Sequence, residues 1–197
     1  MNTTLRALLP ALAFGLSTPA FAETWVVDGS HSNAGFSVSH MTVSTVRGTF
    51  NKWEGTVDWD GKDVKTLRIN ATVDVSSVDT REAKRDEHLR SPDFFDTAKF
   101  PQMTFKSTAV RESKGGAIEL VGELTIRGVT KPVTFQMSRP ASPKADPWGN
   151  IKSGFQATGT INRQDFGLSW NKTLDAGGLV VGDEVTLTID VELNQKK

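Results

Sequence analysis

The chain has no cysteine and no tyrosine among its 197 residues. Without cysteine there are no disulfides, no thiol chemistry and no cysteine-ligated metal, so the core alone must hold the fold. Neither sign of charge dominates, since 23 Lys and Arg residues are matched by 23 Asp and Glu residues. This balance argues against a nucleic-acid partner, which would select for a basic surface.

Long apolar runs are also missing after residue 22, so no later stretch is predicted to span a bilayer. The start of the chain differs from the rest. Arg6 precedes an apolar run over residues 7–16, and Ala20-Phe21-Ala22 has the A-x-A form of a signal peptidase site. We therefore expect a cleavable secretory signal over residues 1–22 and one soluble domain over residues 23–197.

Apolar and polar residues alternate with period two along most of the remaining chain, which predicts strands with one dry face and one wet face. The alternation is clearest over residues 67–75 and 184–193, and residues 46–60 read as one long strand. Pro132 is expected at the first position of a strand, after a turn over residues 128–132. Residues 140–150, with three prolines, predict a loop.

About eight such strands in hairpin order fit either a two-sheet sandwich or a closed barrel. Closure is favoured because a long, strongly patterned last strand would otherwise leave an exposed edge. Small residues on the dry face suggest a barrel with space for a ligand, and they are Gly55, Ala71, Ala109, Gly122, Ala157 and Gly159. They are equally consistent with bends and bulges in a filled barrel. The predicted fold is all-β, an eight-stranded antiparallel barrel with one short helical insertion.

The insertion lies within residues 78–105. Asp79 or Thr80 is the expected helix cap, and Pro92 is expected to end the helix. The spacing of Asp86 with Arg90 predicts an ion pair on a solvated helix face. The alternative is a polar pocket rim that meets an anionic head group through Arg85, His88 and Arg90.

The three histidines, His31, His40 and His88, show no metal-ligand spacing, so no metal site is predicted. His40 shares its strand face with Phe36 and Val38, which places it inward. It could bond a ligand head group, bind a metal or simply bond a backbone carbonyl, which is the commonest case. Asp28, His31 and Ser32 resemble hydrolase parts, but they have the composition of a turn and no G-x-S-x-G elbow accompanies them.

Aromatic side chains are more numerous than a filled core of eight strands needs. An excess of apolar rings with few convergent polar groups fits a site for a long apolar molecule. The rings in question are Trp53, Trp59, Phe94, Phe95, Phe100, Phe105, Phe135 and Phe155.

Three blocks of sequence carry a family resemblance: RDEHLRSPDFFD at residues 85–96, KFPQMTF at 99–105 and GELTIRGVTKPV at 122–133. With them, the chain from Trp25 onward resembles the YceI-like family of exported bacterial proteins that bind lipids and polyisoprenoids. The resemblance implies a lipocalin-like barrel, a long hydrophobic tunnel for an isoprenoid quinone or polyprenyl chain, a periplasmic location and no known catalytic reaction. Relatives often carry tyrosines, and any hydroxyl contact they make is lost here.

Our first hypothesis is therefore a periplasmic carrier of an amphiphilic lipid. It needs no cofactor, has a possible transient partner at the inner membrane, and is a monomer or homodimer. Its expected ligand-binding residues are Phe36, Val38, His40, Trp53, Ile69, Val73, Leu89, Phe94, Phe95, Phe105 and Phe155, with Arg85, His88 and Arg90 at the rim. The rival hypotheses are an enzyme that acts on such a lipid through His40, or through His88 with Asp86, and a filled barrel that works by surface contacts. The helical insertion is the expected gate of the barrel.

Overall fold

The computed structural model describes residues 22–174 and 177–196. The predicted signal segment therefore lies almost wholly outside the described residues. The strands are β1 (Glu23–Val27), β2 (Asn33–His40), β3 (Ser44–Phe50), β4 (Trp53–Trp59), β5 (Arg68–Asp74), β6 (Val78–Asp79), β7 (Gln102–Glu112), β8 (Ile118–Ile126), β9 (Val129–Met137), β10 (Lys144–Ala145), β11 (Ile151–Asn162) and β12 (Val181–Gln195). The helices are α1 (Ala83–Arg90) and the 3-10 turns η1 (Val64–Thr66), η2 (Val75–Ser77) and η3 (Arg163–Phe166).

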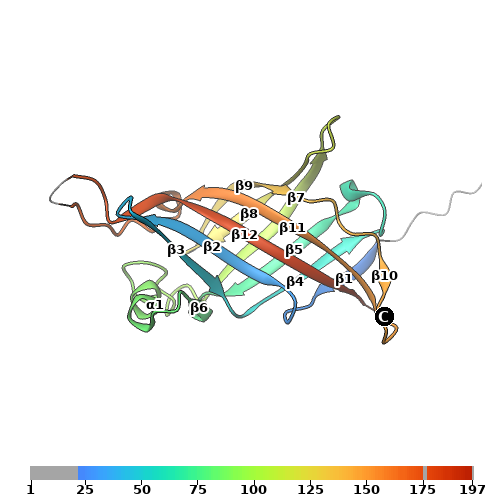
Figure 1. Ribbon diagram of the computed structural model, residues 1–197, viewed down its shortest axis with the longest axis horizontal. Coiled ribbons are helices and arrows are strands. Elements are labelled where there is room, and N and C mark those ends of the chain that lie inside the picture. Colours follow the sequence, from blue (N-terminus) through green and yellow to red (C-terminus); the bar gives the residue numbers. More distant parts are fainter. Residues whose placement is uncertain (1–21, 175–176, 197) are drawn as a thin grey trace, which may run out of the picture.

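The last strand, β12, closes the sheet into a barrel (Figure 1). One edge of β12 pairs with β11 from Glu184 to Asn194. The other edge pairs with β2 near its start, where Val181 faces His40, and with β1 near its end, where Trp25 faces Gln195. The closed barrel consists of β1, β4, β5, β7, β8, β9, β11 and β12, all antiparallel, which confirms the predicted eight-stranded fold.

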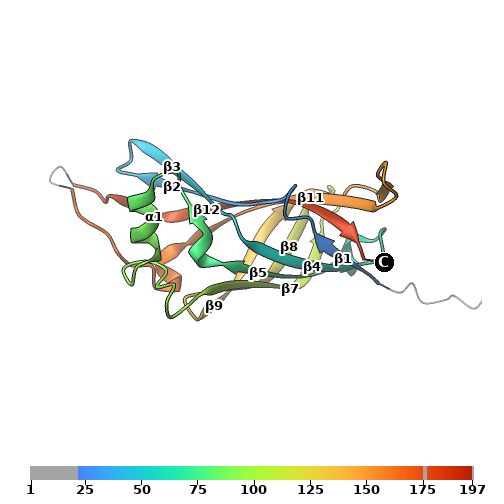
Figure 2. The ribbon, with the colours of Figure 1, turned by 90° about the horizontal axis from the view of Figure 1, so that it is seen from below.

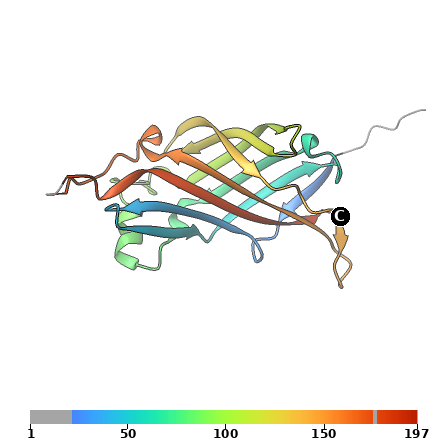
Figure 3. The ribbon, with the colours of Figure 1, turned by 45° about the horizontal axis from the view of Figure 1, so that its top comes forward.

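The β2–β3 hairpin extends this wall at the end of the barrel that carries α1 (Figure 3). Within the described chain, the outer edge of β3 pairs only at Thr49 and Phe50, with the short strand β6. The α1 helix lies beside this edge, across the same end of the barrel (Figure 2). The wall at this end is therefore completed by a helix rather than by another long strand.

Three details of the predicted strands were wrong. Residues 46–60 form two strands, β3 and β4, separated at Asn51–Lys52. The turn before β9 is made by Arg127 and Gly128, both at positive φ, so Pro132 lies inside β9 opposite Glu123. The expected loop over residues 140–150 contains β10, which pairs with the start of β11.

The interior holds two groups of packed side chains. At the end that carries β1 and the C-terminus, Trp25, Trp59 and Leu193 are almost fully buried, and the two indole rings lie 5.8 Å apart. At the α1 end, Phe50, Phe94 and Phe166 belong to the second group. Several side chains of the wall, among them Phe105 and Leu187, contact both groups.

The α1 helix begins one turn later than expected. Glu82, not Asp79 or Thr80, caps it through a hydrogen bond from the Lys84 amide to its carboxylate. It ends at Arg90, before Pro92 as predicted. No helix in the described ranges reaches the length and apolarity that a membrane crossing requires.

Candidate ligand-binding cavity

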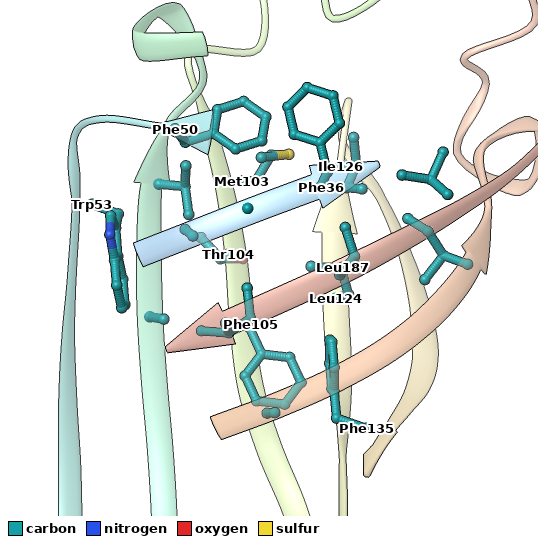
Figure 4. Close-up of a pocket in the computed structure, with 18 of the residues that line it drawn as sticks. Phe36, Phe50, Trp53, Met103, Thr104, Phe105, Leu124, Ile126, Phe135 and Leu187 are labelled. Atoms are coloured by element: carbon teal, nitrogen blue, oxygen red, sulfur yellow. The ribbon is translucent and has the colours of Figure 1, made fainter. Parts of the chain in front are cut away.

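A cavity of about 210 Å³ lies inside the barrel, and residues from both packed groups line it. This volume far exceeds the roughly 10–15 Å³ that one buried water needs, so the space is no packing defect. Its surface is almost entirely carbon, and Arg163 is the only charged residue of the lining in the described chain. Thr104 contributes to the lining from between the inward residues Met103 and Phe105 of β7, and it is exposed on the outer face. Figure 4 shows Phe36, Phe50, Trp53, Met103, Phe105 and Phe135 converging on this space from several strands.

The cavity is long in one direction. Along β12, the alternate residues Val185, Leu187, Ile189 and Val191 line it, and Val181 extends the lining beyond a register shift. The six residue steps from Val185 to Val191 alone correspond to about 20 Å of strand at 3.3 Å per residue. The shape therefore suits a chain-like ligand better than a compact ring.

The small inward residues have two different roles. Gly55, Ala71 and Ala157 line the cavity and leave it room. Glycines elsewhere accept an aromatic ring: a Cβ at Gly48 would lie 2.5 Å from Cζ of Phe36, and one at Gly159 would lie 2.8 Å from Cδ1 of Phe135. The barrel is thus filled where aromatic rings pack on the backbone of Gly48 and Gly159, and it is open beside Gly55, Ala71 and Ala157.

Ten of the eleven predicted ligand-binding residues line this cavity. The exception is His40, which is half-buried at the end of β2 and does not reach the lining. That the other ten contact a lipid stays a prediction. They are Phe36, Val38, Trp53, Ile69, Val73, Leu89, Phe94, Phe95, Phe105 and Phe155.

The cavity lining does not include the predicted rim residues, whose side chains hold the helix in place instead. Arg85 donates through Nε to the Thr80 hydroxyl at 2.7 Å and through a terminal nitrogen to the Thr80 carbonyl at 2.9 Å. Arg90 donates through Nε to the Ser76 carbonyl at 2.9 Å, so it does not pair with Asp86 as expected. The arginines therefore fix α1 to the segment before it.

The proposed pairing of His88 with Asp86 is also absent. The Asp86 carboxylate is buried and accepts hydrogen bonds from the Thr80 amide at 2.9 Å and the Thr80 hydroxyl at 2.5 Å. His88 lies 2.9 Å from the Asp93 carboxylate, with its ring edge-on to Phe94 and Trp170. Both side chains are thus committed to structural contacts.

Arg163, which the sequence did not single out, also lines the cavity, and its side chain is only 4% exposed. It donates to the carbonyls of Leu168, Trp170 at 3.0 Å and Gly182 at 2.9 Å, and to the Asp183 carboxylate at 3.1 Å. Burial lowers the pKa of this guanidinium, and the charge of Asp183 opposes the shift. Arg163 holds the segment after η3 and the start of β12 around the cavity. The only available signal was its position at the end of an alternating strand.

A second cluster of charged groups lies outside the barrel, near the end of β12. The Lys152 ammonium lies 2.9 Å from Asp28 and 2.8 Å from Glu192, and His31 lies 3.1 Å from Asp28. Hydrogen bonds from Ser30, Lys152 and His31 hold the pKa of Asp28 well below its usual range, while Glu192 and Asp28 raise the pKa of Lys152.

Asp28, His31 and Glu192 are close enough together to hold a metal ion. The Lys152 ammonium already supplies the positive charge between the two carboxylates. His31 bonds to Asp28, but the Ser32 hydroxyl bonds to the Glu192 backbone, whereas a catalytic triad would place the histidine between the serine and the aspartate. The arrangement is that of an ion-pair network joining the β1–β2 connection to β11 and β12.

A closed antiparallel barrel around an apolar cavity, with a helix across one end, defines a class of small binding proteins. Comparison with known proteins identifies the particular family. The YceI-like domain matches residues 25–193, and the chain belongs to the YceI-like family.

Relatives and solved structures agree with this assignment. Protein YceI of Salmonella newport (strain SL254) is 40% identical over 190 residues, which cover 96% of this chain and 95% of the relative. The crystal structure of BcnA of Burkholderia cenocepacia superposes with a TM-score of 0.72 at 26% identity, over 84% of this chain and 98% of that one. A polyisoprenoid binding domain from Saccharophagus degradans, implicated in plant cell wall breakdown, shares the fold with a TM-score of 0.63 at 16% identity, over 89% of this chain and 99% of that one.

Proposed function

We propose that this protein binds a polyisoprenoid or isoprenoid-quinone lipid in the barrel cavity and carries it through the bacterial periplasm. The observation that carries the proposal is a long cavity with an almost wholly apolar wall. Burying apolar ligand surface there gains about 25 cal/mol per Å², so a long tail binds tightly with few hydrogen bonds. The polyisoprenoid binding domain of the same fold supports this choice of ligand class.

Catalysis on the lipid is the weaker alternative. The described cavity wall brings no acid and base together, since its lining contains no carboxylate and no histidine, and the Arg163 guanidinium is engaged by backbone carbonyls and Asp183. His40 lies outside the lining. A carrier needs neither an acid nor a base in the cavity wall, so this wall fits binding without catalysis.

The α1 segment is the proposed gate for the lipid. Leu89 from α1 and Phe94 and Phe95 after it line the cavity. The ring of Phe95 meets that of Phe50, at the end of β3, edge to face at 5.7 Å. This contact lies where the outer edge of β3 pairs only with the two-residue strand β6, so its separation would open the cavity sideways.

Two measurements test the binding function. Protein purified from a bacterial periplasm is extracted with organic solvent, and the extract is analysed by mass spectrometry for prenyl lipids. Delipidated protein is then titrated with an isoprenoid quinone in detergent, and the fluorescence of Trp53, which lines the cavity, is followed. Trp53→Phe is the control, because it should keep the affinity and lose most of the signal. Absence of lipid in the extract together with no saturable quinone binding would overturn the proposal.

A further inference from the structure

Two loops meet at the α1 end of the barrel and carry exposed apolar side chains. One is the β2–β3 turn, in which Val43 is 84% exposed and Met41 is 38% exposed. The other precedes β12 and carries Leu179, which is 42% exposed. The Met41 amide donates to the Val180 carbonyl at 2.9 Å, which joins the two loops. These three side chains, here called the apolar tip, are three of the five large hydrophobic residues that are exposed in the described chain.

The backbone of the turn makes its composition unusual. Met41 and Thr42 both have positive φ, 54° and 57°, and the Val43 amide donates to the His40 carbonyl at 3.0 Å. Such a turn favours Asn and Gly, and a β-branched residue at positive φ is an outlier. Met41 and Thr42 therefore occupy positions that a turn selected for stability alone would give to other residues. A strained segment of this kind points to a functional role, here contact with a surface outside the protein.

The β2–β3 hairpin at the apolar tip carries charge of one sign. Residues 29–53, which include β2, the turn and β3, contain no Asp or Glu, although the chain has 23 of them. Arg47 on β3 and Lys172 on the other loop are both exposed. An apolar tip flanked by basic side chains is the combination that binds an anionic lipid surface.

We propose that the apolar tip docks on an anionic lipid bilayer, with Met41, Val43 and Leu179 entering the acyl region. The inference rests on the proposed lipid-carrying function. Val181, the first residue of β12, directly follows Val180 and lines the cavity, so the apolar tip lies close to the proposed lipid site. Docking there would place the Val181 end of the cavity lining near the membrane. A second protein copy fits less well, since three side chains bury far less area than the ~1,200 Å² of a stable interface.

The test measures co-flotation of delipidated protein with vesicles of phosphatidylglycerol and phosphatidylcholine. Val43→Ser removes a side chain that is almost fully exposed, and burying a valine in the bilayer corresponds to about a tenfold gain in partitioning. We expect Val43→Ser to lower partitioning about tenfold and Val43→Asp to lower it further. Vesicles of phosphatidylcholine alone should bind the wild type more weakly.

Trp148→Ser is the matched control, because Trp148 is 82% exposed and comes three residues after β10, the strand that lies at the opposite end of the barrel (Figure 1). It should leave partitioning unchanged. If Trp148→Ser abolishes flotation and Val43→Ser does not, or if Val43→Ser instead converts a dimer to a monomer by light scattering, the proposal is overturned.

Quinone binding in detergent separates the two proposals. The Val43 variants should bind quinone with wild-type affinity and should melt at the wild-type temperature. Normal quinone binding without flotation of the wild type overturns membrane docking alone. Flotation without quinone binding overturns the carrier function alone.

Discussion

Filling the cavity from its wall should weaken ligand binding without destabilising the protein. Ala157 on β11 is buried and lines the cavity, so Ala157→Leu places three further carbon atoms where no protein atoms lie. At about 0.8 kcal/mol for each buried methylene, the added side chain gains at most about 2.4 kcal/mol of folding free energy. The same three carbons exclude an equal part of a lipid tail, which corresponds to about 50-fold weaker binding.

The assay is urea unfolding followed by quinone titration of the same preparation. The expected result is an unchanged or higher free energy of unfolding together with the weaker affinity. Gly122→Ala is the contrasting variant, because a Cβ there would overlap the ring of Phe105 and approach the Lys106 carbonyl to 2.6 Å. One carbon at Gly122 should destabilise by about 1–3 kcal/mol, whereas three at Ala157 should not. A comparable loss of stability from Ala157→Leu would show that the space is not open and would refute the reasoning.

Three further predictions concern the gate, the buried arginine and the outer ion-pair network. Phe95→Ala removes the edge-to-face contact with Phe50, which is worth about 1 kcal/mol. Quinone exchange measured by stopped flow should therefore accelerate roughly 5-fold, and an unchanged rate would count against the gate. Arg163→Met leaves buried carbonyls without donors, so the free energy of unfolding measured with urea should fall by about 3 kcal/mol, and by less for Arg163→Lys. Because the folded pKa of Asp28 is depressed, its stabilisation is present above the unfolded value near 3.9 and is lost as pH falls below it. Asp28→Asn should therefore lower the melting temperature at pH 7, and the difference from wild type should shrink toward pH 3; a constant difference would contradict this assignment.

The barrel could be predicted from the sequence because period-two alternation reports directly on which face of a strand is dry. Val185, Leu187, Ile189 and Val191 line the cavity as their spacing indicates. The same signal failed at Asn51–Lys52. Phe50 and Trp53 both face the cavity although they are three residues apart, so the alternation shifts by one residue between them. Alternation is a local property, and a phase shift within one apolar stretch is easily read as one strand.

The roles of the charged residues in α1 could not be predicted in the same way. Spacing of three or four residues shows which side chains of one helix can meet. It says nothing about η2 and β6, whose backbone groups accept from Arg90 and leave Asp86 to accept from Thr80. Arg163 was missed for a related reason, since its acceptors lie on segments that only the closed barrel brings together.

The pairing of β12 with both β1 and β2 has a consequence for the order in which the chain folds. Trp25 and Gln195 are partners across almost the whole sequence, and Ala34 pairs with Ile189. Contacts of such high sequence separation are formed late and make folding slow, because a long loop must close before they form. The ring cannot shut until the final strand has been synthesised, so the barrel remains open throughout the synthesis of the chain.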